Sequence, residues 1–332
     1  MAATAHPARE PLLEVEDLSV TFHTERGAVR AVERSSFHLN AGETLAVVGE
    51  SGSGKSVTAL AILGLLGDNA TVDSGRILFE GRDLLRLDLD SMRGIRGDRI
   101  AMIFQEPMSS LNPVLTIGRQ VAEPLWEHRG CSWREALDQA AELLARVSIP
   151  DARERLSQYP HQFSGGMRQR VMIAMALACS PKLIIADEPT TALDVTVQAQ
   201  ILELLKNLTR ETGAALILIT HDLGVVARYA ERVVVMYAGR IVESASAREL
   251  YADPRHPYTR GLLASIPTLT GRPGARLPAI PGQPPDPSAL PGGCAFAPRC
   301  AYARAQCRGA APPLERIAKP GAEHWWACYG YD

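Results

Sequence analysis

The chain has 332 residues, enough for two domains, or three, at roughly 100–200 residues each. Hydrophobic residues make up 46% of the chain and charged residues 22%, a composition that excludes disordered and fibrous proteins. The 35 basic and 37 acidic side chains give a net charge of −2, which argues against a protein that binds nucleic acid through its overall charge.

No stretch reaches the roughly 18 continuous apolar residues of a membrane-spanning helix. The best apolar runs, residues 58–67 and 214–219, are far shorter. Residues 1–10 lack the basic start and apolar core of an export signal. We therefore expect a cytoplasmic protein that reaches a membrane only by binding a partner.

The first third of the chain has the pattern of a parallel α/β sheet. Residues 15–22 and 35–39 mix β-branched and polar residues and predict strands. Residues 44–48 form an apolar run typical of a buried strand, which ends in a glycine-rich loop. A helical pattern follows from residue 55 to about 66, so the order is strand, loop, helix.

The middle of the chain, from about residue 107 to 179, is predicted to be mainly helical. Ser132 and Glu135 fit a capping box at the start of one helix, and residues 164–178 form a second helical region. Strands then alternate with helices up to about residue 240; the apolar runs that predict these strands are 183–186, 214–220 and 233–237. We interpret the whole as a parallel-sheet core with a helical insertion.

The last segment differs in composition from the rest. Seven prolines fall within residues 271–291, which predicts an extended connector, because proline removes backbone donors. Four of the six cysteines follow the connector, and in a cytosolic chain such a cluster indicates a metal before disulfides. Cys131 and Cys179 are isolated in helical stretches, and we expect them to be ordinary packing residues.

A phosphate-binding loop is predicted after the strand at residues 44–48. The motif G-x-x-x-x-G-K-[ST] is matched by Gly49, Glu50, Ser51, Gly52, Ser53, Gly54, Lys55 and Ser56. Its glycines let backbone N–H groups wrap a phosphate closely, Lys55 would reach the β- and γ-phosphates, and Ser56 would place a hydroxyl on Mg²⁺. The helix that follows would direct its positive end at the anion.

A pair of carboxylates follows the apolar strand at residues 183–186. Asp187 suits a Mg²⁺ shell, and Glu188 would orient the attacking water. Acid pairs after strands are also common as helix caps, so this assignment depends on the phosphate loop upstream.

The segment Phe163–Arg170, with the sequence FSGGMRQR, resembles the signature of the ATP-binding subunits of ABC transporters. Ser164, Gly165 and Gly166 match the usual Leu-Ser-Gly-Gly-Gln pattern, whereas Phe163 and Met167 depart from it. The resemblance implies a P-loop NTPase fold with a RecA-like parallel-sheet core, an antiparallel β subdomain and a helical subdomain at about 107–179. It also implies that the signature serves the nucleotide held by the opposite subunit.

Other residues fall where this family expects them. Gln105 matches the Q-loop glutamine, which contacts Mg²⁺ and water, and Asp194 matches the D-loop. His221 matches the switch histidine, which would contact the γ-phosphate, although a lone His after a strand is more often a cap or a surface residue. Phe22 lies where the family stacks an aromatic ring on adenine, and a plain strand residue is an equal alternative. The resemblance adds Val57 to the nucleotide-binding residues.

Two segments outside the ATP motifs resemble oligopeptide, dipeptide and nickel importers, namely residues 105–113 and 255–263. We divide the chain accordingly into an ATPase domain, residues 1–243, and a C-terminal extension, residues 244–332. Met108, Leu111 and Val114 would either line a groove for a helix of the membrane subunit or pack in the core.

Four cysteines within residues 294–328 suit either a tetrahedral zinc or a [4Fe–4S] cluster; they are Cys294, Cys300, Cys307 and Cys328. The close Cys pairs common in zinc sites are absent, and the resemblance to the dipeptide branch also favours the cluster. Zinc is the second choice, and four unconnected thiols are the remaining alternative.

The function implied is an ATPase that powers peptide import, in which Glu188, His221, Lys55 and Gln105 carry the chemistry. Its expected partners are a second, sister ATPase subunit, two integral membrane permeases and a substrate-binding protein, at the cytoplasmic face of the membrane. Alternatives are an importer of nickel or another small solute, a soluble ABC-type ATPase of DNA repair, translation or iron–sulfur assembly, and an iron–sulfur redox or sensor protein.

Overall fold

The computed structural model describes residues 11–25, 27–191, 193–266, 279–317 and 323–330. The chain folds into two compact units. The first, here called the helical unit, comprises residues 40–43 and 86–219. The second, here called the sheet unit, comprises residues 11–39, 44–85 and the described residues from 220 onward.

The helical unit contains three parallel strands: β6 (Ile100–Ile103), β7 (Leu183–Asp187) and β8 (Ala215–Thr220). Every residue of β7 and β8 is buried. Such uninterrupted apolar strands are expected where helices cover both faces of a parallel sheet. The carboxyl end of β7 therefore delivers its last residues to one edge of the sheet.

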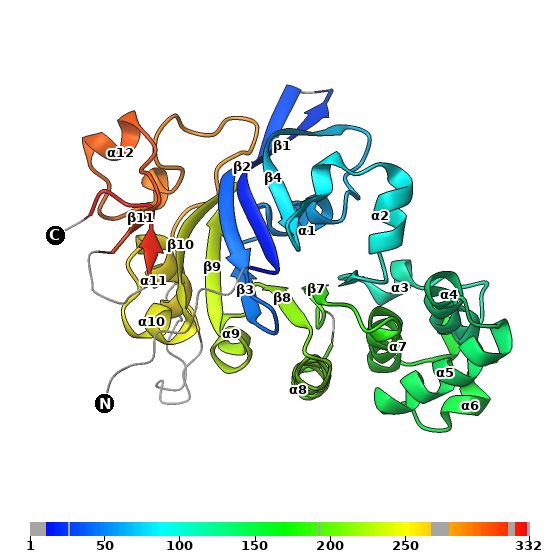
Figure 1. The fold of residues 1–332 in the computed structure, drawn as a ribbon. Helices are drawn as coiled ribbons and strands as arrows, with labels where there is room; N and C mark the ends of the chain where they lie inside the picture. Colours follow the sequence, from blue (N-terminus) through cyan, green and yellow to red (C-terminus); the bar gives the residue numbers. More distant parts are fainter. Residues whose placement is uncertain (1–10, 26, 192, 267–278, 318–322, 331–332) are drawn as a thin grey trace, which may run out of the picture. The chain divides into compact units, whose positions relative to one another are not determined.

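Most of the helical unit consists of helices, and α4, α5 and α7 pack against one another (Figure 1). The bounds are α2 Leu89–Ile95, α3 Pro107–Ser110, α4 Ile117–Arg129, α5 Trp133–Arg146, α6 Ala152–Arg155, α7 Gly165–Leu177 and α8 Val195–Thr212. The capping box at the start of α5 is confirmed, because Ser132 and Glu135 each bond to the backbone N–H of the other. The second helical region is also confirmed, with Ser164 as the cap of α7.

An antiparallel sheet makes up one part of the sheet unit (Figure 1). Its strand order is β2 (Gly27–Leu39), β1 (Leu13–Thr24), β4 (Ala70–Phe79) and β5 (Arg82–Asp83). The strands predicted at 15–22 and 35–39 lie within β1 and β2, which are longer because their pairing continues to the hairpin at Thr24 and Gly27. The antiparallel subdomain expected from the resemblance is thus present.

The other sheet of this unit carries the phosphate loop. In it β3 (Thr44–Val48) runs parallel to β9 (Arg232–Tyr237), and β10 (Arg240–Ser246) pairs antiparallel with β9. The C-terminal segment extends this sheet, because β12 (Trp325–Trp326) pairs with β10 and β11 (Glu315–Arg316) with β12. The helices of the unit are α1 Lys55–Ile62, α9 Leu223–Tyr229, α10 Ala247–Ala252, α11 Pro257–Ala264 and α12 Ala305–Gly309.

A buried aromatic cluster joins the C-terminal segment to β9. The rings of Tyr237 and Tyr258 lie 4.6 Å apart, and those of Tyr237 and Phe296 lie 5.3 Å apart in an edge-on arrangement. All three belong to the hydrophobic core that also includes Ala46 and Val48 of β3. This packing fixes the segment near residue 296 to the strands that carry the phosphate loop.

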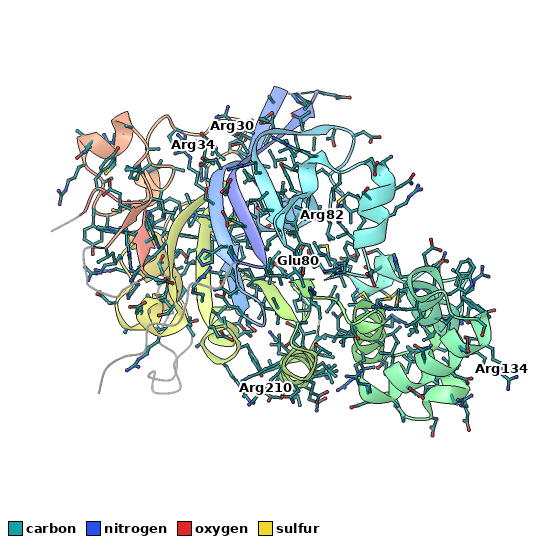
Figure 2. All side chains as sticks on the ribbon, viewed as in Figure 1. Arg30, Arg34, Glu80, Arg82, Arg134 and Arg210 are labelled. Carbon is teal, nitrogen blue, oxygen red and sulfur yellow. The ribbon has the colours of Figure 1, made fainter. Side chains whose placement is uncertain are left out.

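Charged side chains of both signs are spread over the surface (Figure 2). Arg30 and Arg34 of β2 are exposed. The carboxylate of Glu33 forms ion pairs with Arg30 at 3.1 Å and with Arg240 at 2.8 Å.

In the part of the chain that the structure describes, none of the helices combines the length and the hydropathy that crossing a bilayer requires.

Several predicted boundaries were wrong. Helix α1 ends at Ile62 rather than near residue 66, because Gly64 adopts a positive φ of 60°. Cys131 and Cys179 lie just outside helices, since Gly130 ends α4 in the left-handed conformation and α7 ends at Leu177. The first part of the predicted connector, residues 271–278, lies outside the described residues; residues 279–291 form neither helix nor strand.

Candidate functional site

The phosphate loop follows β3 and leads into α1, the context that the motif requires. Its first glycine, Gly49, has a φ of +155°, and a Cβ there would lie 2.2 Å from the Met236 carbonyl oxygen. Gly54 has a φ of +99°, and its Cβ would lie 2.6 Å from the Ala31 oxygen. Contacts this short exclude any side chain, so both glycines are dictated by the close packing of the loop on neighbouring backbone.

Lys55 lies inside the curve of this loop. Its Nζ donates to the carbonyl oxygens of Gly49 at 2.9 Å and Glu50 at 3.0 Å, and it lies 3.4 Å from the Ser53 hydroxyl. The side chain is only 5% exposed. A buried ammonium beside the start of a helix provides a strong site for an anion, because the cation and the helix N–H groups act together.

Two residues of the sheet unit that the sequence analysis did not assign to the loop contact Glu50. The guanidinium of Arg299 forms a two-pronged ion pair with the Glu50 carboxylate at 2.6 and 3.1 Å. The Glu50 backbone N–H donates to the Tyr258 hydroxyl at 2.8 Å. Both partners lie more than 200 positions away along the chain, so no local spacing signals them.

Gln105 and Glu188 are brought together in the helical unit. Strand β7 ends at Asp187, which is buried, and Glu188 follows with a φ of +45°. Its Oε2 accepts hydrogen bonds from Gln105 Nε2 at 3.0 Å and from Thr191 Oγ1 at 2.9 Å. Two donors on one oxygen fix the orientation of the carboxylate.

Ser164 and Asp194 each cap a helix. The Ser164 hydroxyl accepts from the Met167 N–H at the start of α7, and Ser164 and Gly165 are exposed. Asp194 accepts from the N–H groups of Thr196 and Val197 at the start of α8. A Cβ on Gly166 would lie 2.9 Å from Val197, so the start of α7 packs closely on α8.

His221 and Phe22 both belong to the sheet unit. His221 follows β8 and is exposed, and Asp222 next to it caps α9 through the Gly224 N–H at 2.8 Å. Phe22 is half-buried on β1, opposite Val29 of β2 and Ala70 of β4.

The three residues suggested as a groove for a membrane subunit differ in exposure. Met108 is 67% exposed and Val114 75% exposed, whereas Leu111 is 2% exposed. Leu111 therefore belongs to the core, and of these three residues Met108 and Val114 present apolar surface.

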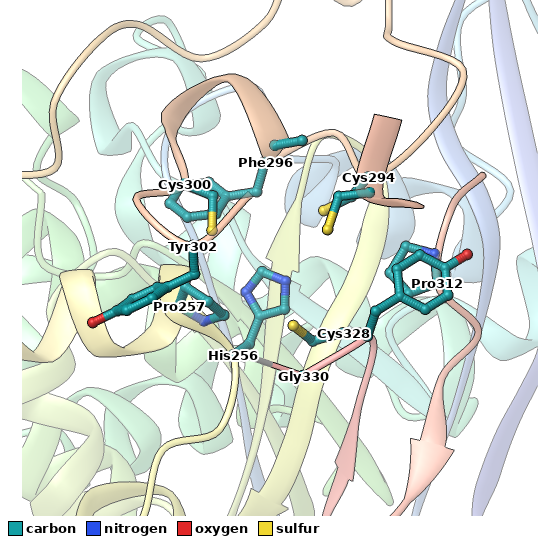
Figure 3. A pocket seen from close by; sticks show the side chains of 12 residues that line it. His256, Pro257, Cys294, Phe296, Cys300, Tyr302, Pro312, Cys328 and Gly330 are labelled. Carbon is teal, nitrogen blue, oxygen red and sulfur yellow. The ribbon is translucent and has the colours of Figure 1, made fainter. Parts of the chain in front are cut away.

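The four C-terminal cysteines line a single pocket, together with His256 and Phe296 (Figure 3). The pocket is partly open to solvent. All six cysteines of the chain are free. Their convergence is not local, because residue 328 reaches the pocket through β12, which pairs with β10.

The donor set of this pocket fits a group held by four thiolates. Burial raises the pKa of the Cys294, Cys300 and Cys328 thiols, and the neighbouring cysteines add to the rise for each. Within the described ranges, however, no three His, Cys, Asp or Glu side chains stand as a group placed to hold a metal ion. The pocket therefore provides the right donors without a preformed ligand geometry.

Comparison with known proteins agrees with these motifs. A family model described as "ABC transporter" matches residues 32–191, and one described as "Oligopeptide/dipeptide transporter, C-terminal region" matches residues 242–307. The chain is similar to the solved ATP-binding cassette MJ0796, in a dimeric post-hydrolysis state bound to ADP and Pi, with 31% identity and a TM-score of 0.64 over 71% of this chain and 99% of that chain. The fold and the motifs define an ABC transporter ATPase cassette.

Curated relatives narrow the family. The chain is 53% identical to the oligopeptide transport ATP-binding protein OppD of Salmonella typhimurium, covering 97% of this chain and 96% of that protein. It is 56% identical to the dipeptide transport ATP-binding protein DppD of Bacillus subtilis, covering 88% and 87%. The chain belongs to the family of ATP-binding subunits of oligopeptide and dipeptide ABC transporters.

Proposed function

We propose that this chain binds and hydrolyses ATP to power the import of peptides through an ABC transporter. The observation that carries the proposal is the position of Lys55, whose Nζ lies 2.9 and 3.0 Å from two carbonyl oxygens inside the phosphate loop. Membership of the oligopeptide and dipeptide family supports peptides as the transported class.

In this proposal the backbone amides of residues 49–54 and the start of α1 bind the phosphates, and Lys55 neutralises the β- and γ-phosphate charge. Mg²⁺, when bound, supplies further neutralisation of that charge. Its ligands would include the Ser56 hydroxyl, Asp187 and Gln105. Val57, which follows the loop, also contacts the nucleotide in this proposal, and Phe22 stacks on the adenine ring.

The hydrolytic step is assigned to two further residues. Glu188 orients the attacking water and accepts its proton, a role that suits a carboxylate already held on one oxygen by Gln105 and Thr191. His221 donates to the γ-phosphate, and its exposure supports contact with a ligand.

A second ATPase subunit completes each site. We assign Ser164, Gly165, Gly166 and Asp194 to the nucleotide bound by the neighbouring chain. Ser164, Gly165 and Asp194 are exposed at the starts of two helices, where N–H groups attract anions. The second subunit is a sister chain, and the full complex adds two permeases and a substrate-binding protein at the cytoplasmic face of the membrane.

Residues 1–243 would form the ATPase domain, with its helical subdomain at about 107–179, and residues 244–332 the extension. We propose that Cys294, Cys300, Cys307 and Cys328 hold a [4Fe–4S] cluster, with zinc as the second choice. The shared pocket supports this assignment.

The test is a reconstitution in phospholipid vesicles of this chain with its sister subunit and both permeases. ATP hydrolysis should rise when a peptide-loaded binding protein is added. Lys55→Ala should abolish the stimulated hydrolysis, while Lys206→Ala, which removes an exposed lysine of α8, should leave it intact. Hydrolysis by this chain that never depends on permeases or peptide would instead indicate a soluble ATPase.

A further inference from the structure

Arg299 connects the C-terminal extension directly to the phosphate loop. Its Nη1 lies 2.6 Å from Glu50 Oε2, and its Nη2 lies 3.1 Å from Oε1. Glu50 is the second residue of the loop, whereas Arg299 precedes Cys300 of the cysteine pocket. A two-pronged arginine–carboxylate pair fixes orientation as well as distance, so the pair sets the position of Glu50 closely.

The guanidinium is fully satisfied in this position. Besides its two bonds to Glu50, it donates from Nε to the Pro281 oxygen at 3.0 Å, from Nη1 to the Tyr237 hydroxyl at 3.3 Å and from Nη2 to the Ile280 oxygen at 3.5 Å. These five contacts match the five N–H groups of an arginine. The side chain is 4% exposed, and its bonds to Glu50 raise its pKa, so it stays charged.

The backbone of Glu50 is held from the same part of the chain. Its N–H donates to the hydroxyl of Tyr258, a buried residue that packs on Tyr237. Both the amide and the carboxylate of Glu50 are therefore bound by side chains that lie between residues 258 and 299. The position of Glu50 at the start of the phosphate loop is therefore fixed by Tyr258 and Arg299 as well as by the loop itself.

The position of Glu50 matters to the ATP site because of Lys55. The Glu50 carbonyl oxygen is one of the two that accept hydrogen bonds from Lys55 Nζ. A shift of Glu50 would move this oxygen and with it the ammonium that binds the phosphates. Arg299 can thus affect nucleotide binding without touching the nucleotide.

We propose that Arg299 is a positioning residue for the ATP site, through which the C-terminal extension sets the affinity of the phosphate loop for nucleotide. This inference rests on the proposed function, since it takes the loop to bind ATP. It assigns the extension a role in ATP binding in addition to its place in the fold.

The test measures the Kd of the full-length chain for MgATP together with its melting temperature. Arg299→Gln should weaken binding about tenfold, a magnitude typical of coupling between distinct sites. The matched control is Arg308→Gln, which removes an exposed arginine beside Cys307 in the same extension and should leave the Kd unchanged. Arg299→Lys keeps the charge without the two-pronged geometry and should bind with intermediate affinity.

A double-mutant cycle separates positioning from general support of the fold. Glu50→Gln should weaken binding as Arg299→Gln does, and the double variant should lose no more than either single variant, because both remove the same contact. If Arg299→Gln does not fold, Glu50→Gln and Arg299→Lys provide the same comparison.

A lower melting temperature with an unchanged Kd in these variants would overturn the proposal, because the pair would then be purely structural. If the unmodified chain failed to bind MgATP, or if Lys55→Ala bound it normally, the proposed function would fail instead.

Discussion

Glu188 is the residue on which hydrolysis depends most directly in this account. Its carboxylate is oriented before nucleotide binds, because Gln105 and Thr191 both donate to Oε2. Activation of the attacking water is thus assigned to Glu188, whereas Lys55 is assigned to the phosphates, both in binding them and in neutralising their charge.

This division predicts that Glu188→Gln binds MgATP with normal affinity and turns it over about 10²- to 10⁴-fold more slowly, the usual loss when a general base is removed. Equilibrium binding and steady-state hydrolysis by the assembled transporter would be measured on the same preparation. The matched control is Glu203→Gln on α8, which should hydrolyse ATP normally. Near-normal turnover by Glu188→Gln would remove Glu188 from the catalytic role.

At the scale of single elements, a buried histidine precedes helix α11. His256 caps the helix, since its Nδ1 accepts from the Tyr258 N–H at 3.1 Å. Burial lowers the pKa of His256 from its ordinary value of 6.5 to about 4, although the nearby Glu243 charge opposes the shift. The folded chain therefore keeps this ring neutral at pH values where the unfolded chain protonates it.

The sign of the pH effect follows from this difference. Between the unfolded pKa of 6.5 and the folded pKa of about 4, the unfolded state binds more protons, so the free energy of unfolding falls as the pH falls. The control is His256→Asn, which keeps a capping acceptor but does not titrate. When the pH falls from about 7 to about 4.5, the free energy of unfolding of the unmodified chain should fall by about 2 kcal/mol more than that of the variant. Urea unfolding at the two pH values measures this, and equal losses in both proteins would contradict it.

The elements built from local patterns could be predicted from the sequence. Four features were predicted because each depends on residues close together in the chain. They are the strand at residues 44–48, the glycine loop after it, the start of α1 at Lys55 and the capping box of α5. Element ends were less predictable. Strand β2 begins at Gly27 rather than at residue 35, since its length is set by pairing with β1.

Contacts between distant residues could not be predicted from spacing. Arg299 meets Glu50 across 249 positions and Tyr258 meets it across 208, and neither residue belongs to an ATP motif. The cysteine pocket is an intermediate case. Its four thiols stood out by their density, but the strand pairing that brings Cys328 to the others was not visible in the sequence.

At the scale of the whole molecule, the cysteine pocket predicts a bound group in the purified chain. Protein prepared without oxygen should contain about four iron and four sulfide per chain, with a broad absorption band, if the thiols hold a [4Fe–4S] cluster. Cys300→Ser should lower the iron content, and Cys131→Ser, outside the pocket, should not. About one zinc per chain would establish a zinc site instead of the cluster, and a preparation with neither metal would exclude both the cluster and the zinc site.

The central claim is that two ATPase subunits pair. If they do, substitutions can affect a chain's binding of its own nucleotide and its action on the partner's nucleotide separately. In this proposal the phosphate loop binds the chain's own nucleotide, whereas the exposed start of α7 would act on the nucleotide of its neighbour. Ser164 is suited to a decisive substitution, because both Asp and Asn can cap α7 in its place and so preserve the helix. Only Asp adds a negative charge that would repel a γ-phosphate.

The most direct test compares Ser164→Asp with Ser164→Asn, measuring MgATP binding to the chain alone and ATP turnover by the assembled transporter. The account predicts normal binding by both variants and a turnover at least about 100-fold lower for Ser164→Asp, as expected when a group facing the transferring phosphate becomes repulsive. Full turnover by Ser164→Asp, or a loss of binding by the chain alone, would contradict the claim that this serine serves the nucleotide of a partner.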